Sequence, residues 1–268
     1  MSPSPNAHCG RVIWRALLLL LSAAELCPAF AAEMNADAAH YQRCVLQVSQ
    51  NAAAALEAAK SWEAEDGGGP AGHCEALALI ALKRPAEAAT RLEALALAPG
   101  DYDASLRTDL FAQAGNAWLV AEKADKAIDD LTTAISRAAD AHTPSINIAL
   151  YYSDRARAHL LRGETTEAQS DLDRSIALSP TPVALTLHAR IRREGKDGKG
   201  AMADLSRALA LDPNFAEAIL ERGRLAAMNG DRKAARADYL KVLSIEKASD
   251  IADAAREEIA ALDVRGAH

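Results

Sequence analysis

A pair of positions recurs at long intervals between residues 88 and 239 of this chain. An alanine is followed four residues later by a large apolar or aromatic residue, and the pattern occurs five times. The pairs are Ala88/Leu92, Ala127/Leu131, Ala168/Leu172, Ala201/Leu205 and Ala235/Tyr239. The alanines are 39, 41, 33 and 34 residues apart, and periods of about 20–50 residues are typical of repeat architectures. The spacing therefore predicts stacked copies of one structural unit.

Other positions keep the same register. A small residue lies twelve positions before each alanine, at Ala76, Gly115, Ala156, Ala189 and Gly223. Gly163 and Gly230 fall where the middle of a unit must turn, and Pro180 and Pro213 fall at the ends of units. Half of the residues are hydrophobic but only 4% are aromatic, and the Ala/Leu-rich segments favour helix by intrinsic propensity. The sequence predicts an all-α fold in which Asp212-Pro213-Asn214 joins two units.

The register resembles the tetratricopeptide repeat, a helix–turn–helix unit. The best copy is AEAILERGRLAAMNGDRKAARADYLKVL, residues 216–243, although the Trp and Tyr positions of the family's first helix are mostly replaced along the chain. The resemblance implies a right-handed solenoid of about five antiparallel helix pairs over residues 70–247, with neighbouring units burying each other's apolar faces. The two longer steps imply insertions around 98–105 and 138–147.

The ends of the repeat array need polar caps. Residues 32–69 are expected to form an N-terminal helical cap segment, with a helix or helix pair over 40–65. Residues 248–268 are expected to form a C-terminal capping helix and a frayed tail. Ser249 or Asp250 would be the N-cap of that helix, and Glu257 and Glu258 would face water.

The first residues have the pattern of a signal peptide. Arg11 and Arg15 precede the apolar run ALLLLLSAAEL, and small residues follow at Ala29 and Ala31. We expect cleavage of residues 1–31 near Ala31-Ala32 and a periplasmic or secreted protein. The alternative is an uncleaved anchor, but the apolar run is shorter than the roughly 20 residues that span a bilayer.

The charge balance argues against two classes of partner. Cleavage would remove Arg11, Arg15 and Glu25 and change the formal net charge from −7 to −8. Because binding to phosphate backbones requires a basic face, no nucleic-acid partner is expected. No second hydrophobic segment is present, so no stable membrane insertion is expected after cleavage.

Two cysteines, Cys44 and Cys74, would remain in an oxidising compartment. A disulfide between them is the simplest expectation, and it would join the N-terminal segment to the first unit. A metal site is the alternative, because His40 and His73 lie nearby in the sequence. Neither histidine has the usual zinc-ligand spacing from its cysteine, so no metal is expected.

The chain has no recognisable catalytic motif. The segment REGKDGKGAM, residues 193–202, has glycines and lysines but lacks the spacing of a phosphate-binding loop, so we interpret it as a turn inside a unit. His159 and His188 fall where neighbouring helices pack. The sequence predicts a protein that is not an enzyme and needs no cofactor.

The candidate site follows from the family resemblance, which implies that the first helix of each unit lines a concave groove. The ninth positions of these helices are Leu77, Asn116, Arg157, Arg190 and Arg224, and Arg193 follows Arg190 on the same face. The fifth positions are His73, Ala112, Ser153, Thr186 and Leu220. An Asn followed by successive arginines is similar to the clamp with which some repeat proteins hold a peptide carboxylate, although the clamp's lysines are missing here.

Two interpretations of Asn116, Arg157, Arg190, Arg193 and Arg224 stay open. They could form a partner-binding groove, or the arginines could pair with acids such as Asp154 and Glu221 on a solvated face. The functional hypothesis is a scaffold or adaptor that binds another protein or peptide in its groove, with an acidic segment as one candidate. The alternative is a soluble carrier or regulator that binds a small anionic ligand or lipid there.

Overall fold

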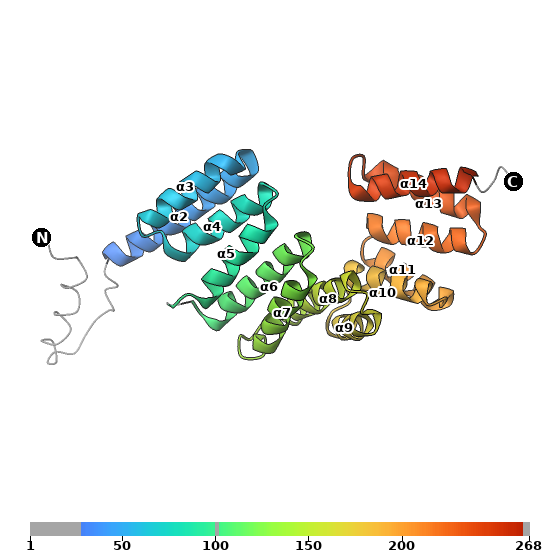
Figure 1. The fold of residues 1–268 in the computed structure, drawn as a ribbon, viewed down its shortest axis with the longest axis horizontal. Coiled ribbons are helices and arrows are strands. Elements are labelled where there is room, and N and C mark those ends of the chain that lie inside the picture. Colours follow the sequence, from blue (N-terminus) through green and yellow to red (C-terminus); the bar gives the residue numbers. More distant parts are fainter. Residues whose placement is uncertain (1–27, 100–101, 265–268) are drawn as a thin grey trace, which may run out of the picture. The chain divides into compact units, whose positions relative to one another are not determined.

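The computed structural model describes residues 28–99 and 102–264 (Figure 1). The chain divides into two units, residues 1–43 and residues 44–268. In the first unit the described residues 28–43 are helical and form the beginning of α2 (Pro28–Gln50). The predicted signal peptide, residues 1–31, lies almost entirely outside the described residues.

The second unit contains the rest of α2 and twelve further helices. These are α3 (Ala52–Ala64), α4 (Gly68–Ala81), α5 (Pro85–Leu97), α6 (Ala104–Val120), α7 (Ala124–Arg137), α8 (Ser145–Leu161), α9 (Thr165–Leu178), α10 (Pro182–Glu194), α11 (Gly198–Leu211), α12 (Ala216–Met228), α13 (Arg232–Ile245) and α14 (Asp250–Val264). No strand occurs among the described residues. The predicted all-α repeat of helix pairs is confirmed.

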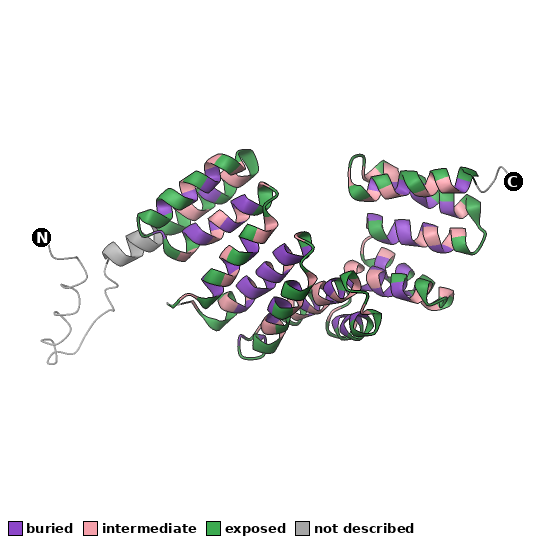
Figure 2. Cartoon of the chain, viewed as in Figure 1, coloured by how far each residue is buried: buried purple, intermediate pink, exposed green. Residues whose placement is uncertain are grey.

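The helices pair in sequence order. We call α4, α6, α8, α10 and α12 the first helices, and α5, α7, α9, α11 and α13 the second helices. Each first helix packs against the second helix that follows it, and α6, α8, α10, α12 and α14 also contact one another in succession. Buried residues lie where helices face their neighbours, and α6 and α12 carry many of them (Figure 2).

Small residues bring the two helices of a pair together, as predicted. A Cβ added to Gly115 would lie 2.6 Å from Leu131 Cγ, and one added to Gly223 would lie 2.5 Å from Tyr239 Cε1. Both distances are shorter than real carbon contacts, so only glycine fits between these helices without a shift. The large residue of each pair therefore fills the space that the small residue leaves.

The turn inside every helix pair uses one left-handed residue. The residue is Lys83, Glu122, Gly163, Lys196 or Gly230, and its φ is between 56° and 81°. Glycine adopts this conformation without steric cost, whereas other residues do not. The REGKDGKGAM segment is such a turn, as predicted: α10 ends at Glu194, and the Asp197 side chain accepts a hydrogen bond from Gly200 N at 2.9 Å as the N-cap of α11.

Asp212-Pro213-Asn214 lies between α11 and α12 and joins two helix pairs, as predicted. α11 ends at Leu211, and the Asp212 carboxylate accepts a hydrogen bond from Asn214 N at 2.9 Å before α12 begins at Ala216. At the C-terminal end, the Ser249 hydroxyl accepts from Ala252 N at 3.3 Å, as expected of an N-cap. The tail residues 265–268 lie outside the described residues.

The extra residues predicted around 98–105 and 138–147 lengthen α6 and α8 as well as the loops that precede them. α6 and α8 each have 17 residues, whereas α10 and α12 each have 13. Counted from the small residues Gly115 and Ala156, both longer helices gain one turn at the N-terminal end. Two neighbouring first helices are therefore extended on the same side.

A buried aspartate precedes the large residue of four second helices, a feature that the sequence analysis missed. The four are Asp130, Asp171, Asp204 and Asp238. Arg155 makes two hydrogen bonds to Asp171, at 2.7 and 2.8 Å, and Arg222 makes two to Asp238, at 2.6 and 2.8 Å. His188 Nδ1 lies 3.0 Å from Asp204 Oδ2, so His188 is a packed residue, as predicted. Only the recurring Asp before Leu or Tyr could have indicated these pairs.

The cysteines Cys44 and Cys74 form a disulfide, which confirms the predicted pairing. Both are buried, and their Cα atoms are 6.3 Å apart. The bridge ties the end of α2 to α4 within the second unit. His73 instead hydrogen-bonds through Nε2 to Gln113 Oε1 of α6, at 2.7 Å.

Candidate functional site

The five predicted groove residues all lie on first helices. Asn116 is on α6, Arg157 on α8, Arg190 and Arg193 on α10, and Arg224 on α12. Arg193 and Arg224 are brought together by Glu221, which contacts both, and the first helices of the row contact one another in succession. Their surroundings differ in charge from one end of the row to the other.

Arg193 and Arg224 are held by carboxylates of the chain itself. Arg193 Nε donates to Glu221 Oε1 at 2.6 Å, and Arg224 donates to Glu221 at 3.2 Å and to Glu258 at 2.7 Å. Glu221 is 3% exposed. Glu257 is exposed, as expected, whereas Glu258 is only partly exposed, because α14 packs against α12 and brings this carboxylate to Arg224. These two arginines are already neutralised.

Arg190 and Arg157 have weaker partners. Arg190 Nε lies 3.3 Å from Glu194 Oε1, and Arg157 Nη1 lies 3.4 Å from Asp154 Oδ1. Both arginines are about half exposed. Exposed pairs of this kind contribute roughly 0–1 kcal/mol, so these side chains can exchange partners. The acids Asp154 and Glu221 are the ones that the solvated-face interpretation named.

Four of the five fifth positions of the first helices are buried between helices, and of these four only Ala112 also borders a hollow. Ala112, Ser153, Thr186 and Leu220 are all buried. Ser153 shares a hydrogen bond with Ser175 Oγ at 2.8 Å, and the Thr186 hydroxyl donates to Pro182 O at 2.7 Å. The family register therefore places these residues between helices here, because small side chains let neighbouring units pack closely.

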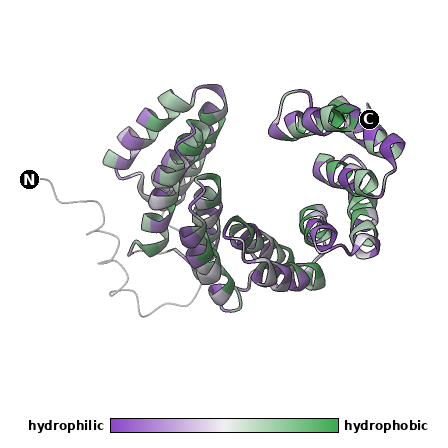
Figure 3. Ribbon diagram, turned by 45° about the vertical axis from the view of Figure 1, so that its right-hand side comes forward, coloured by the Kyte–Doolittle hydropathy of each residue, from purple (hydrophilic) through white to green (hydrophobic). Residues whose placement is uncertain are grey.

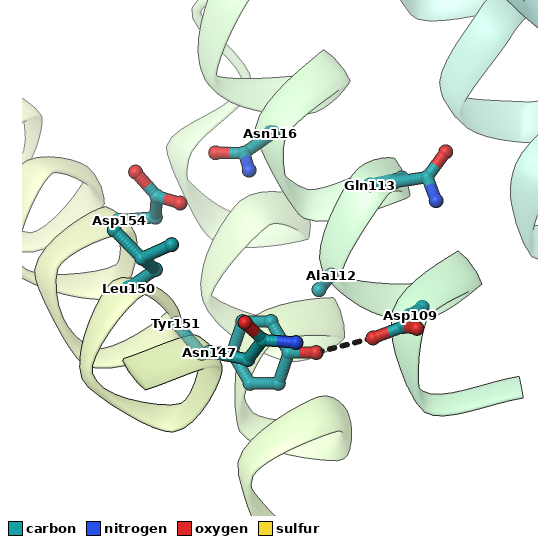
Figure 4. A pocket seen from close by; sticks show the side chains of 8 residues that line it. All are labelled: Asp109, Ala112, Gln113, Asn116, Asn147, Leu150, Tyr151 and Asp154. Carbon is teal, nitrogen blue, oxygen red and sulfur yellow. Dashed lines mark hydrogen bonds between the residues drawn. The ribbon is translucent and has the colours of Figure 1, made fainter. Parts of the chain in front are cut away.

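A hollow of about 270 Å³ lies between α6 and α8 (Figure 4). Its lining residues recur at spacings of three and four on each helix, so each helix presents one face to it. They are Asp109, Ala112, Gln113 and Asn116 on α6, and Asn147, Leu150, Tyr151 and Asp154 on α8. Of the predicted site residues, only Asn116 is among them.

The additional turn of α8 contributes one residue to the hollow. Asn147 belongs to the additional N-terminal turn of α8, so the longer helix adds an amide to one end of the hollow. Ala112 is the smallest of the lining side chains and leaves the space open from α6 (Figure 4). The sequence indicated the insertion but not which face it would extend.

A hydrogen bond from Tyr151 of α8 to Asp109 of α6 joins the two helices of the hollow. The Tyr151 hydroxyl donates to Asp109 Oδ1 at 2.6 Å (Figure 4). Burial and the neighbouring Asp109 carboxylate raise the pKa of the Tyr151 hydroxyl. Tyr151 therefore stays a hydrogen-bond donor at neutral pH and orients the Asp109 carboxylate.

The second carboxylate, Asp154, is on the other side of the hollow. Burial raises the pKa of Asp154 above its usual value, while a hydrogen bond from Asn116 and the charge of Arg157 act in the opposite direction. Asn116 is thus placed where the sequence predicted a ligand contact, but its closest described charged neighbour is an acid. The hollow has two carboxylates and no cation among its lining residues.

A second hollow, of about 430 Å³, lies among α7, α8 and α9. Arg155 lines it, but this guanidinium donates to Asp171 twice and to Thr132 Oγ1 at 2.9 Å. Because these donors are used inside the protein, Arg155 has little hydrogen-bonding capacity left for a ligand in this hollow. Among the described residues no three His, Cys, Asp or Glu side chains come together as a metal site.

Comparison with known proteins gives the fold. PilF from Pseudomonas aeruginosa superposes with a TM-score of 0.65 at 16% identity, over 87% of this chain and 99% of that chain. A tetratricopeptide repeat protein from Parabacteroides merdae superposes with a TM-score of 0.63 at 14% identity, over 84% of each chain. The helix pairs, their register and this superposition agree. The chain has the tetratricopeptide-repeat fold.

A sequence relative also has these repeats. The tetratricopeptide repeat and J domain-containing co-chaperone DNJ1 of Fusarium oxysporum f. sp. lycopersici is 35% identical over 109 residues, which are 40% of this chain. The match spans only 21% of that protein. No family model matches the chain.

The tetratricopeptide-repeat helices are amphipathic rather than uniformly apolar. Hydrophilic residues interrupt the helices all along the chain (Figure 3). Within residues 28–99 and 102–264, no helix has the length and apolar character needed to cross a membrane.

Proposed function

We propose that this protein is a non-enzymatic scaffold that binds an extended segment of another polypeptide across its first helices. The observation that carries the proposal is the hollow between α6 and α8. Asn116 and Asn147 supply amide groups there, and an amide can both donate and accept hydrogen bonds. The third amide, of Gln113, already bonds to His73 Nε2 through Oε1. A combination of donors and acceptors suits a peptide backbone, which presents donors and acceptors in alternation.

The row of first helices extends that surface beyond the hollow. α6, α8, α10 and α12 contact one another in succession, so residues on their free faces can follow one bound chain. Solenoid repeats bind extended partners through such surfaces. The paired arginines on α10 and α12 support a structural role there more than a role in holding an acidic ligand.

The chemistry of the hollow also supports binding over catalysis. Tyr151 donates a hydrogen bond to Asp109 there. A tyrosine whose pKa is raised is a poor base or nucleophile at neutral pH. The two carboxylates likewise disfavour the small anionic ligand or lipid considered as the alternative.

Site-specific photocrosslinking tests the proposal. A photoreactive amino acid at Gln113 or Asn147 should give discrete adducts with one or a few polypeptides in cells that make the protein. The same amino acid at Ser206, on the exposed face of α11, is the matched control. Adducts that are absent, or equally abundant at all three positions, would contradict polypeptide binding at this surface.

We also propose that the protein is exported. The buried disulfide between Cys44 and Cys74 supports this, because disulfides persist in oxidising compartments. The signal-peptide pattern of residues 1–31 supports it from the sequence. Mass spectrometry of the purified protein should find an N-terminus near Ala32, and an intact N-terminus in a cytoplasmic fraction would contradict export.

A further inference from the structure

We propose that the hollow between α6 and α8 selects a cationic side chain, a lysine or an arginine, of the bound polypeptide. The inference rests on the function proposed above and adds the chemical class of its ligand. It reverses the expectation of an acidic segment.

The charge of the hollow is one-sided. Its eight lining residues include two carboxylates, Asp109 and Asp154, which come from different helices and face the same space (Figure 4). The nearest cation described for either is Arg157, which is half exposed and 3.4 Å from Asp154. Such a pair is weak, so an incoming cation can compete for Asp154.

The carboxylates retain acceptor capacity. Asp109 accepts a hydrogen bond from Tyr151 through Oδ1, and a carboxylate can accept about four in total. The carbonyl oxygens of Asn116 and Asn147 are further acceptors at the hollow. A lysine ammonium has three donors and a guanidinium five, so either group can be satisfied there. Partial enclosure also strengthens the ion pair relative to water.

The size and the apolar part of the hollow fit one long side chain. Its volume, about 270 Å³, is below the range of about 300–1,000 Å³ that is usual for whole small-molecule ligands. Leu150 and Ala112 supply apolar surface beside the carboxylates. Lysine and arginine have apolar stems that pack on such surface while the charged end reaches polar groups.

The two carboxylates that meet the arginines of α10 and α12 are already paired inside the protein. Glu221, the buried carboxylate of α12, is already shared by Arg193 and Arg224. Glu258 is held by Arg224. These two carboxylates are therefore not available to an incoming cation, whereas the partners described for Asp109 and Asp154 are Tyr151, Asn116 and the weakly held Arg157.

A peptide array provides the test. The probes are N-acetylated, C-amidated nonapeptides of random sequence with one fixed central residue, so that no terminal charge contributes. The purified, disulfide-bonded protein should be retained about tenfold more by Lys-centred and Arg-centred pools than by Glu-centred pools. Asp109→Asn combined with Asp154→Asn should abolish this preference, because both changes keep the shape and remove the charge.

The matched control is Glu217→Gln. Glu217 is exposed and lies six residues before Gly223 on α12, as Asp109 lies six before Gly115 on α6. This variant should keep the wild-type preference. A circular-dichroism melt of each variant shows whether it is folded before it is placed on the array.

The outcomes of this test distinguish the cationic selection from polypeptide binding itself. Peptide capture without a Lys or Arg preference, or a preference that survives in the double variant, overturns the cationic selection and leaves peptide binding in place. Capture of no peptide overturns both proposals. Complete displacement of Lys-centred peptides by an equal concentration of n-butylamine would assign the hollow to a free amine and overturn the polypeptide ligand.

Discussion

Arg193 of α10 and Glu221 of α12 form a 2.6 Å hydrogen-bonded ion pair, and the Glu221 side chain is 4% exposed. The pair joins two consecutive first helices. Because Arg224 also contacts Glu221, one buried carboxylate connects two arginines of the predicted groove. The arginine row at this end of the chain therefore stabilises the stack of repeats.

The Arg193 pair gives a stability prediction. Arg193→Met should lower the free energy of unfolding by about 1.5–3 kcal/mol, since a hydrogen bond to a buried charge is lost while Arg224 still compensates part of it. Arg190→Met, which breaks only an exposed pair with Glu194, should cost less than about 1 kcal/mol. Urea unfolding monitored by circular dichroism measures both, and equal losses would contradict a structural role specific to Arg193.

The disulfide should contribute strongly to stability. Its cysteines are 30 residues apart, and closing such a loop is worth about 3–4 kcal/mol in the chain-entropy model. Reduction with dithiothreitol should therefore lower the melting temperature of the wild type. The Cys44→Ala/Cys74→Ala variant should melt near the reduced wild type and should not respond to dithiothreitol.

The left-handed turns predict a stabilising substitution. Lys196 has φ 64° in the turn between α10 and α11, a conformation that disfavours residues with a Cβ. Lys196→Gly should raise the free energy of unfolding by about 0.5–1 kcal/mol, whereas Gly230→Ala should lower it by about 1 kcal/mol. Ala203→Gly, inside α11, is the control and should be destabilising by about 1 kcal/mol. Stabilisation by both new glycines would point to a cause other than the turn.

Asp130 predicts a pH dependence. Burial, with the nearby Glu93 and Asp129 carboxylates, raises the pKa of Asp130 to about 7, and its usual value in unfolded chains is about 3.9. The folded state thus binds the proton more tightly, so this group's contribution to stability is complete below about pH 4 and is lost as the pH rises through 7. The other groups at this place are Trp118, which donates to Glu93 at 2.6 Å, and Lys126, which lies over the Trp118 ring.

The matching experiment compares two aspartates of the same register. Asp130→Asn should remove the loss of stability between pH 5 and pH 8, because the amide stays neutral. Asp171→Asn should be destabilising throughout this range, since Asp171 is paired with Arg155 and needs its charge. Chemical unfolding at several pH values measures both, and a slope in Asp130→Asn equal to that of the wild type would contradict the prediction.

The repeat register could be predicted because local steric needs recur in the sequence. Gly115 and Gly223 are required where the facing Leu131 and Tyr239 approach within a carbon contact. Pro213 and Ser249 mark a joint and a cap for reasons of backbone geometry that extend over only a few residues. The left-handed turn was visible at Gly163 and Gly230, but at Lys83, Glu122 and Lys196 the same conformation is imposed by helix packing on residues that give no such signal.

The charge of the binding surface could not be predicted from the same register. Arg193 and Arg224 have the spacing of groove residues, yet their charges are met by Glu221 and Glu258 from other helices. The all-α repeat, the helix pairs and the cysteines able to form a bridge could be predicted from the sequence, because they depend on periodicity and short-range sterics. Which charges are neutralised and where a hollow remains became known from the folded chain, because electrostatic pairing and free volume depend on side chains brought together from distant parts of the sequence.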